Sequence, residues 1–188
     1  ALCDEKKVLL ILDEVQTGLG RTGALFSHQD YGFTPDIMTL AKGLANGAPI
    51  GAMGCTDSVA SGFSIGSHAC TFGGNPLSSA AALATVQTLV KPGFIEGAAE
   101  VGAYFLDKLN ALSTQHDCIV EVRGKGLMIG VEFKEAIAPL MGAMIDAGIV
   151  CGPAGPNVLR FLPPLVVTKE EVDRVMATLT ACLSEVQW

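Results

Sequence analysis

The chain has 188 residues, of which 49% are hydrophobic and 16% are charged, and its net charge is −7. This length is enough to bury a sizeable core, in about one to one and a half domains. Acidic residues outnumber basic ones, 19 to 12, and no basic stripe is present, which argues against nucleic acid as a partner. The apolar runs are too short to span a membrane.

The cysteines and the first residues indicate the setting of the chain. Six cysteines are scattered without a CxxC pair, and the three histidines share no ligand spacing. This pattern predicts free thiols in a reducing compartment, hence a cytoplasmic location, and no metal site. The chain does not begin with Met and carries no signal-peptide pattern. Because its first residues lead directly into a strand pattern, we expect a piece of a longer protein.

The first half of the chain alternates strand and helix patterns. An apolar run at residues 7–12 predicts a buried strand of a parallel sheet. A loop at 62–75 precedes an Ala-rich helix that ends at Lys91-Pro92-Gly93. The predicted strands are 7–12, 36–41 and 49–55, and the predicted helical segments are 24–31, 57–60 (capped by Thr56 or Asp57) and 77–90.

A smaller α+β unit is predicted from residue 94 onward. A hairpin is expected around Arg123-Gly124-Lys125-Gly126, and Thr168 with Glu171 forms a capping box for the last helix. The sequence therefore predicts an α/β fold with an appended α+β domain, divided into residues 1–93 and 94–188. In this second part the expected helices are 94–115, 136–147 and 169–186, and the expected strands are 119–122, 127–133, 149–151 and 158–161.

Asp13 and Lys42 each follow a predicted strand directly. Ligands of parallel sheets bind beyond the carboxyl ends of the strands, so both side chains are expected to face one crevice. A buried acid and a lone, nearly buried lysine suit pyridoxal phosphate (PLP), whose aldehyde bonds a lysine and whose ring nitrogen pairs with an acid. Taken alone, Asp13 also suits a turn cap, and Lys42 also suits a solvated strand end.

The segment Gly18-Leu19-Gly20-Arg21-Thr22-Gly23 formally matches GxGxxG. A dinucleotide-binding loop needs its glycines directly between strand and helix, with an acid at the end of the next strand. Here Asp13–Thr17 intervenes, and Asp36 begins its strand instead of ending it. A nicotinamide-dependent dehydrogenase is therefore an alternative that the context disfavours.

Two further motifs have residue types that suit anions. In Thr71-Phe72-Gly73-Gly74-Asn75-Pro76, a threonine beside glycines just ahead of a helix can bind phosphate oxygens, or can simply form a helix-entry turn. Arg160 lies in an apolar setting, Leu159-Arg160-Phe161-Leu162-Pro163-Pro164. A desolvated guanidinium generally has an anionic partner, either a ligand carboxylate or an internal acid.

Together these motifs resemble the class III (ornithine/acetylornithine-type) PLP-dependent aminotransferases, over essentially the whole chain and closest to the acetylornithine branch. The resemblance implies the rear part of a fold-type I large domain followed by a small C-terminal domain. Cys70 stands where a serine is expected. The motifs that carry the resemblance are LDEVQTG (12–18), GRTG (20–23), PDI (35–37), AKGL (41–44), PIGA (49–52), TFGGNP (71–76) and RFLPPL (160–165).

The resemblance also implies a role for each matching residue. Lys42 would form the Schiff base with PLP and then move the proton between the substrate α-carbon and the cofactor. Asp13 would pair with the ring nitrogen, and Gln16 would contact the side of the ring that carries the hydroxyl. Thr71 would bind the phosphate of the PLP held by the other subunit of a homodimer. Arg160 would bind the α-carboxylate of the amino donor and of 2-oxoglutarate.

The implied reaction is transamination from N-acetylornithine to 2-oxoglutarate, giving N-acetylglutamate semialdehyde and glutamate in arginine biosynthesis. Related activities on succinylornithine, ornithine or 4-aminobutyrate stay open. Members of the family are about twice as long, so the chain resembles their C-terminal half. A phosphate loop, a ring-stacking aromatic residue and a further arginine would then lie elsewhere, and a non-catalytic fragment is the alternative from a different class.

Overall fold

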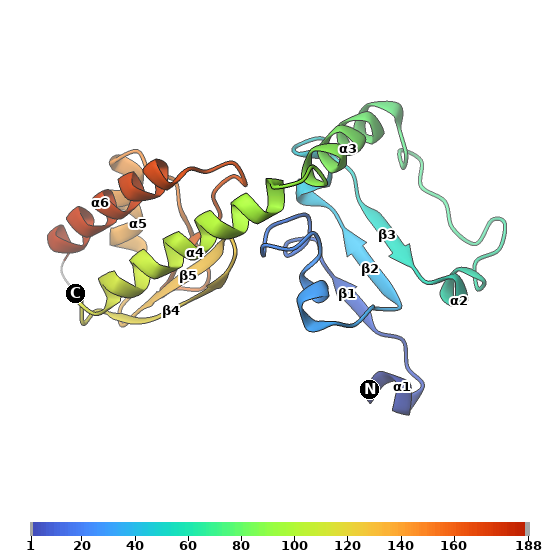
Figure 1. Cartoon of the computed structure of the whole chain (residues 1–188), viewed down its shortest axis with the longest axis horizontal. Coiled ribbons are helices and arrows are strands. Elements are labelled where there is room, and N and C mark those ends of the chain that lie inside the picture. Colours follow the sequence, from blue (N-terminus) through green and yellow to red (C-terminus); the bar gives the residue numbers. More distant parts are fainter. Residues whose placement is uncertain (1, 187–188) are drawn as a thin grey trace. The chain divides into compact units, whose positions relative to one another are not determined.

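The computed structural model describes residues 2–186 and divides into two compact units, Ala1–Ile95 (unit 1) and Glu96–Trp188 (unit 2) (Figure 1). The predicted domain boundary, between residues 93 and 94, lies close to this division. Residues 1, 187 and 188, at the ends of the two predicted domains, lie outside the described part. The assignment of the units to a large cofactor domain and a small C-terminal domain stays a prediction.

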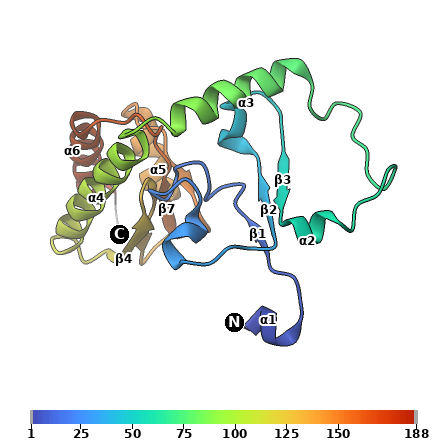
Figure 2. The same ribbon diagram turned by 45° about the vertical axis from the view of Figure 1, so that its right-hand side comes forward.

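Unit 1 is built on a three-stranded sheet of order β1-β2-β3 (Figure 2). The strands are β1 (Ile11–Asp13), β2 (Ile37–Leu40) and β3 (Ala52–Cys55). β1 pairs with β2 in parallel, as predicted, and β3 pairs with β2 antiparallel. The parallel pair is locked at its amino end, where the backbone N of Leu10 donates to Asp36 Oδ2 at 2.8 Å. The register of this pair places Asp13 opposite Thr39.

The prediction that the first strand is long and buried is wrong. β1 has three residues, and Val8, Leu9 and Ile11 are 56%, 58% and 59% exposed. The main helix of the unit, α3 (Pro76–Leu89), packs against the short 3₁₀ helix η2 (Lys42–Ala45) and not along this strand. The apolar run therefore indicates the strand correctly, but nothing in it shows whether a neighbour covers it.

The other helices of unit 1 are short, except α3. They are α1 (Leu2–Lys6), η1 (Ser27–Tyr31) and α2 (Asp57–Ala60), with Thr56 at the N-cap of α2 as predicted. Asn75 caps α3, because its Oδ1 accepts from the backbone N of Ser78 at 3.0 Å. Ser78 is buried and donates its hydroxyl to the carbonyl of Pro49 at 3.0 Å. Residues 61–74 are exposed and form a long loop between α2 and α3 (Figure 1).

Unit 2 is a four-stranded antiparallel sheet of order β4-β5-β7-β6 with three helices. The predicted hairpin is confirmed. The strand expected at 149–151 is instead found at 152–153, because the backbone N of Ile149 closes the end of α5 on the carbonyl of Met144 at 2.8 Å. The elements are α4 (Phe94–Ser113), β4 (Ile119–Lys125), β5 (Met128–Phe133), α5 (Ala138–Asp146), β6 (Gly152–Pro153), β7 (Val158–Phe161) and α6 (Lys169–Glu185).

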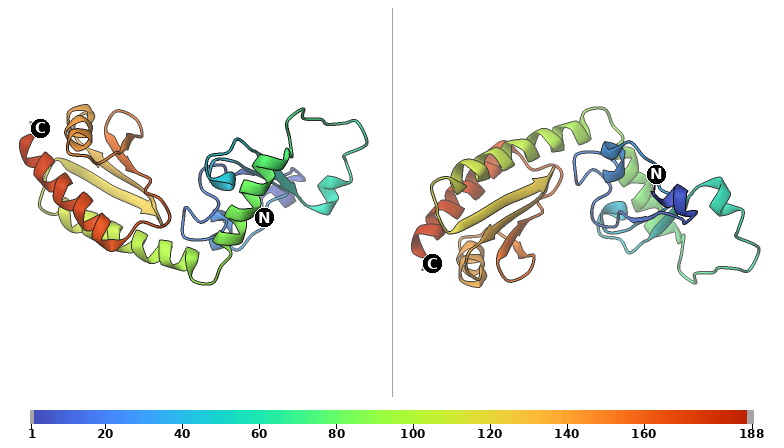
Figure 3. Two further views of the ribbon diagram at one scale, coloured as in Figure 1. Left: turned by 90° about the horizontal axis from the view of Figure 1, so that it is seen from above. Right: turned by 90° about the horizontal axis from the view of Figure 1, so that it is seen from below.

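One face of this sheet carries the core of unit 2. Alternate residues of β5 and β7 point into it, and the Phe105 and Phe161 rings lie 5.2 Å apart between centroids. The predicted capping box starts α6, with the backbone N of Thr168 donating to Glu171 Oε2 at 2.9 Å. α4 and α6 run beside each other (Figure 3), joined where the Tyr104 hydroxyl donates to Asp173 at 2.7 Å.

Two glycines of α4 are expected to respond oppositely to alanine. A Cβ on Gly102 would lie 2.9 Å from the Cα of Gly126 in the β4–β5 turn, whereas a Cβ on Gly97 meets no atom within 4 Å in the described part of the chain. Gly102→Ala should lower the free energy of unfolding by about 1–3 kcal/mol through overpacking against backbone. Gly97→Ala should raise it by about 0.5–1 kcal/mol through helix propensity. Urea denaturation of the two variants tests this, and equal shifts would contradict it.

Candidate active site

Asp13 and Lys42 lie at the same edge of the unit 1 sheet. Asp13 ends β1 opposite Thr39 of β2, and Lys42 follows the end of β2. Asp13 Oδ1 accepts from the backbone N of Val15 at 2.9 Å and from Thr39 Oγ1 at 3.2 Å. Its Oδ2 makes no hydrogen bond to any residue from 2 to 186. The side chain is thus oriented by two donors and keeps one oxygen for a ligand.

Lys42 is held in a left-handed backbone conformation. Its φ is 45°, which is unfavourable for a residue with a Cβ and persists only where the surroundings fix it. The fixing groups are the buried Leu44 and Ala45 of η2 itself and the hydrogen bond from Leu44 N to the Ala41 carbonyl at 2.9 Å. The backbone of the lysine is therefore fixed while its side chain points into solvent.

The prediction that Asp13 and Lys42 are buried is wrong, since both side chains are exposed. Burial cannot be what activates this lysine in the chain as it stands. Both groups are therefore accessible to a ligand from solution. The common location of the two residues, which is what the chemistry requires, agrees with the prediction.

The buried acid of the site is Glu14, which the sequence analysis did not single out. Its side chain is 3% exposed, and its two oxygens accept from Thr17 Oγ1, from the backbone N of Ser27 and His28, and from His28 Nδ1 when that nitrogen carries the ring proton. Burial raises the pKa of Glu14, but these hydrogen bonds lower it by more, so its pKa lies below the ordinary 4.5. Strand alternation was the available signal, because an outward Asp13 places Glu14 inward.

The lowered pKa of Glu14 predicts a pH effect on stability. The carboxylate is favoured in the folded chain, so its stabilisation is complete above its ordinary pKa of 4.5 and is lost as pH falls through the lower, folded-state pKa. Glu14→Gln lacks this contribution at every pH. The difference in unfolding free energy between wild type and Glu14→Gln should therefore be largest near neutral pH and shrink below pH 4.5. Urea titrations from pH 3.5 upward measure it, and a pH-independent difference contradicts it.

Gln16 and Thr71 occupy different surroundings. Gln16 is half-buried in the turn after β1, where the backbone N of Gly18 donates to the Glu14 carbonyl at 3.0 Å. Thr71 is exposed in the loop that precedes α3. Within residues 2–186, no hydrogen bond joins either side chain to Asp13 or Lys42. Gln16 thus lies in the turn that directly follows Asp13, whereas Thr71 lies in a separate loop.

Arg160 lies in β7 on the sheet face opposite the core, since its neighbours Leu159 and Phe161 are buried inward. Its partners in the register are Gly130 on β5 and Gly152 on β6, which carry no side chains and leave room around the guanidinium. Its Nε is buried and has no hydrogen-bond partner among the described residues. A desolvated donor without a partner costs about 1–3 kcal/mol, so this position favours an anion from outside.

The structure rules out the dinucleotide alternative. Residues 14–26 form a run of turns between β1 and the 3₁₀ helix η1, so Gly18–Gly23 does not connect a strand directly to a helix. Gly20 and Gly23 have φ of 87° and 92°, and the backbone N of Leu19 closes on the Leu25 carbonyl at 2.6 Å. These glycines serve a compact turn, and the N–H groups of Ser27 and His28 at the start of the next helix, η1, donate to Glu14 instead of a pyrophosphate.

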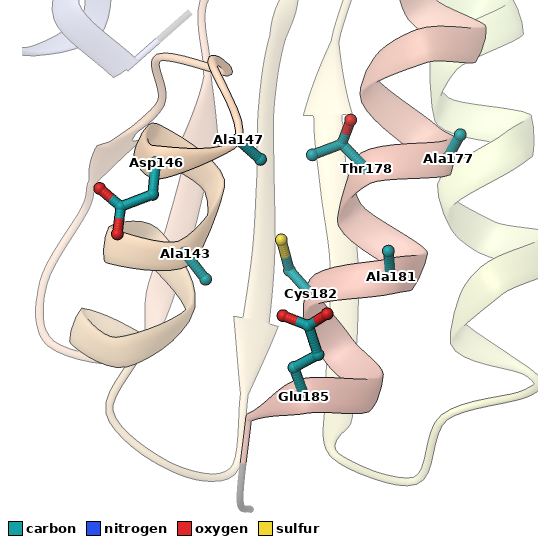
Figure 4. Close-up of a pocket in the computed structure, with 8 residues that line it drawn as sticks. All are labelled: Ala143, Asp146, Ala147, Ala177, Thr178, Ala181, Cys182 and Glu185. Carbon is teal, nitrogen blue, oxygen red and sulfur yellow. The ribbon is translucent and has the colours of Figure 1, made fainter.

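A groove of about 580 Å³ lies between α5 and α6 in unit 2. Figure 4 shows Ala143 and Ala147 facing α6, with Thr178 and Cys182 facing back. None of the five predicted site residues lines it. The six cysteines of the chain are free thiols, and residues 2–186 contain no cluster of three His, Cys, Asp or Glu suited to a metal. The same residues include no helix long and apolar enough to cross a membrane.

Comparison with solved structures identifies the fold. Ornithine δ-aminotransferase of Plasmodium falciparum superposes with a TM-score of 0.92 at 34% identity, over 98% of this chain and 48% of that chain. The mixed α/β fold is thus that of the PLP-dependent aminotransferases, as predicted. Residues 1–183 match the family model described as Aminotransferase class-III. The chain belongs to the class-III aminotransferase family.

Among the curated relatives that the chain resembles are two named aminotransferases with about half of their sequence in common with it. Acetylornithine aminotransferase of Caldanaerobacter subterraneus subsp. tengcongensis is 47% identical over all of this chain and 48% of its own length. [LysW]-aminoadipate semialdehyde transaminase of Deinococcus radiodurans is 50% identical over 97% of this chain and 42% of its own length. The chain therefore spans about half the length of the curated relatives it matches.

Proposed function

We propose that the chain carries the lysine-bearing part of a PLP-dependent aminotransferase site that transfers the amino group of N-acetylornithine to 2-oxoglutarate. The observation that supports this most is the pairing of an accessible lysine with an oriented aspartate at one sheet edge. Asp13 keeps Oδ2 without a hydrogen bond among residues 2–186, and Lys42 has a fixed backbone. An amine and a carboxylate at one edge are the donor set that PLP requires, so the residues present fit the group.

Each predicted site residue has a defined task in this proposal. Lys42 would hold PLP covalently and, once displaced by the substrate amine, would move the proton at the substrate α-carbon. Asp13 would hold a proton on the ring nitrogen through Oδ2, and Gln16 would contact the side of the ring that carries the hydroxyl. When bound, PLP supplies an electron-withdrawing ring that stabilises negative charge at the α-carbon. The chain's own residues orient the reacting groups and move the proton.

Arg160 would bind the carboxylate that N-acetylornithine, 2-oxoglutarate and glutamate share. Its planar guanidinium suits a carboxylate, and its buried Nε has no partner in the described part of the chain. Thr71 would bind a phosphate held by a second subunit, which makes the whole protein a homodimer with sites that include residues of both subunits. Both substrates are small polar metabolites, and with six free thiols they support a cytoplasmic location.

The proposal is tested by mapping where PLP bonds to the chain. The purified chain is mixed with PLP, reduced with borohydride, digested and analysed by mass spectrometry. One modified peptide carrying Lys42 supports the proposal. Label spread over the exposed lysines, or no label, would mean that the chain does not form the site and is a non-catalytic piece.

A second candidate substrate follows from the relative of Deinococcus radiodurans, whose identity of 50% is as high as that of the acetylornithine enzymes. The amine that corresponds to an aminoadipate semialdehyde is therefore the alternative donor to N-acetylornithine, beside succinylornithine, ornithine and 4-aminobutyrate. Adding each amine to the PLP-loaded chain and following loss of the cofactor's absorbance band distinguishes them. The fastest conversion identifies the donor.

A further inference from the structure

We infer that Glu14 is a positioning residue, whose buried carboxylate fixes the turn that presents Asp13 and Gln16 to the cofactor. The inference rests on the function proposed above. Glu14 follows Asp13 directly, yet the two side chains differ sharply, since Glu14 is 3% exposed and Asp13 lies in solvent. The site therefore contains two adjacent acids with separate tasks.

The hydrogen bonds of Glu14 exclude direct contact with a ligand. Oε2 accepts from Thr17 Oγ1 at 2.7 Å and from the backbone N of Ser27 at 3.1 Å. Oε1 accepts from the backbone N of His28 at 2.9 Å, and His28 Nδ1 lies 3.2 Å away. A carboxylate offers about four lone-pair positions, and these three donors, joined by His28 Nδ1 when it carries the ring proton, occupy them. Glu14 can therefore act only through the chain that it holds.

The segment that Glu14 holds is the turn of residues 14–18, which follows Asp13 directly. The backbone N of Glu14 donates to the Thr39 carbonyl at 3.0 Å, and its own carbonyl accepts from the backbone N of Gly18 at 3.0 Å. Val15 lies between these two anchors and donates its backbone N to Asp13 Oδ1 at 2.9 Å. The direction of the Asp13 carboxylate thus depends on Val15, whose position depends on Glu14.

The side chain of Glu14 must be a carboxylate to make all of these hydrogen bonds. A glutamine of the same shape would turn an NH₂ group toward one pair of donors, from Thr17 and Ser27 or from His28. A backbone N–H, that of Ser27 or of His28, would then face a donor, and leaving such a group unsatisfied costs about 1–3 kcal/mol. The turn is expected to move away from β2 in response. Val15 and Gln16 would move with it.

The test compares Glu14→Gln with Asp36→Asn in the full chain. Asp36 is a matched control, because its carboxylate accepts from Leu10 N at the other end of the same β1–β2 pair. Two readouts are used: the Kd and absorbance maximum of bound PLP, corrected for the folded fraction, and amide hydrogen exchange at Val15 and Gly18 without PLP.

We expect Glu14→Gln to raise the Kd for PLP on the order of tenfold, the lower end of what losing an orienting partner costs at metal sites. The absorbance maximum should shift, and the amides of Val15 and Gly18 should exchange faster. Asp36→Asn should lower stability without changing either readout at the site. Thr17→Val, which removes one donor to Glu14, should give a smaller change of the same kind. Thr17→Ser, which keeps the hydroxyl, should behave like the wild type in both readouts.

Two results would overturn the inference. One is an unchanged Kd, spectrum and Val15 exchange in Glu14→Gln. The other is an equal change in Asp36→Asn, which would mean that general destabilisation is the cause. Failure of the wild-type chain to bind PLP at Lys42 would overturn the proposed function instead. The exchange of Val15 and Gly18 would then decide whether Glu14 holds the Asp13 turn.

Discussion

Lys42→Arg is expected to abolish the covalent attachment of PLP to the chain. The arginine keeps the charge, the approximate length and the Cβ of lysine, so the left-handed backbone of this position, with φ of 45°, is no more strained than before. A guanidinium is not a nucleophile at neutral pH, because it stays protonated. After borohydride reduction the wild-type chain should carry one PLP group, and the variant should carry none.

Lys7 provides the matched control for this experiment. It is also exposed and also has a left-handed backbone, with φ of 55°, but it follows the short helix α1 and not the carboxyl end of a strand. Lys7→Arg should therefore keep the full label. Loss of label in both variants, or in neither, would show that the location beside Asp13 does not select Lys42.

The common edge of Asp13 and Lys42 could be predicted from local pattern. Each residue follows a strand-like run, and parallel strands end at the same edge, so no long-range information was needed. The same holds for the cap at Thr168, where the residue type and its spacing to Glu171 determine the helix start. Local chemistry was sufficient at these positions.

Burial and partners could not be predicted in the same way. Val8 and Leu9 are exposed because no described helix packs on them, and an apolar run contains no information about its neighbours. The donors that hold Glu14 come from Ser27 and His28, which lie 13 and 14 residues further along the chain. The space beside Arg160 depends on a register that pairs it with two glycines. Each of these features is set by tertiary structure.

Phe105→Ala is expected to cause a large loss of stability in unit 2. Phe105 is 2% exposed, and its ring packs 5.2 Å from that of Phe161 in the core. Replacing a buried phenylalanine by alanine costs about 3–5 kcal/mol, from lost burial and the cavity left behind. Whole domains are stable by only about 5–15 kcal/mol, so unit 2 should be close to unfolded. Phe105→Leu, which fills much of the cavity, should lose clearly less.

Phe72→Ala is the control for this substitution, because the Phe72 side chain is 82% exposed in the loop before α3. Its unfolding free energy should stay within about 0.5 kcal/mol of wild type. Urea denaturation measures the unfolding free energy of both variants, and amide hydrogen exchange measures the opening of β5 and β7. Because Phe161 adjoins Arg160 on β7, loss of the Phe105 contact should also release the strand that carries the arginine. A Phe105→Ala chain as stable as Phe72→Ala would show that this ring pair does not hold β7 in place.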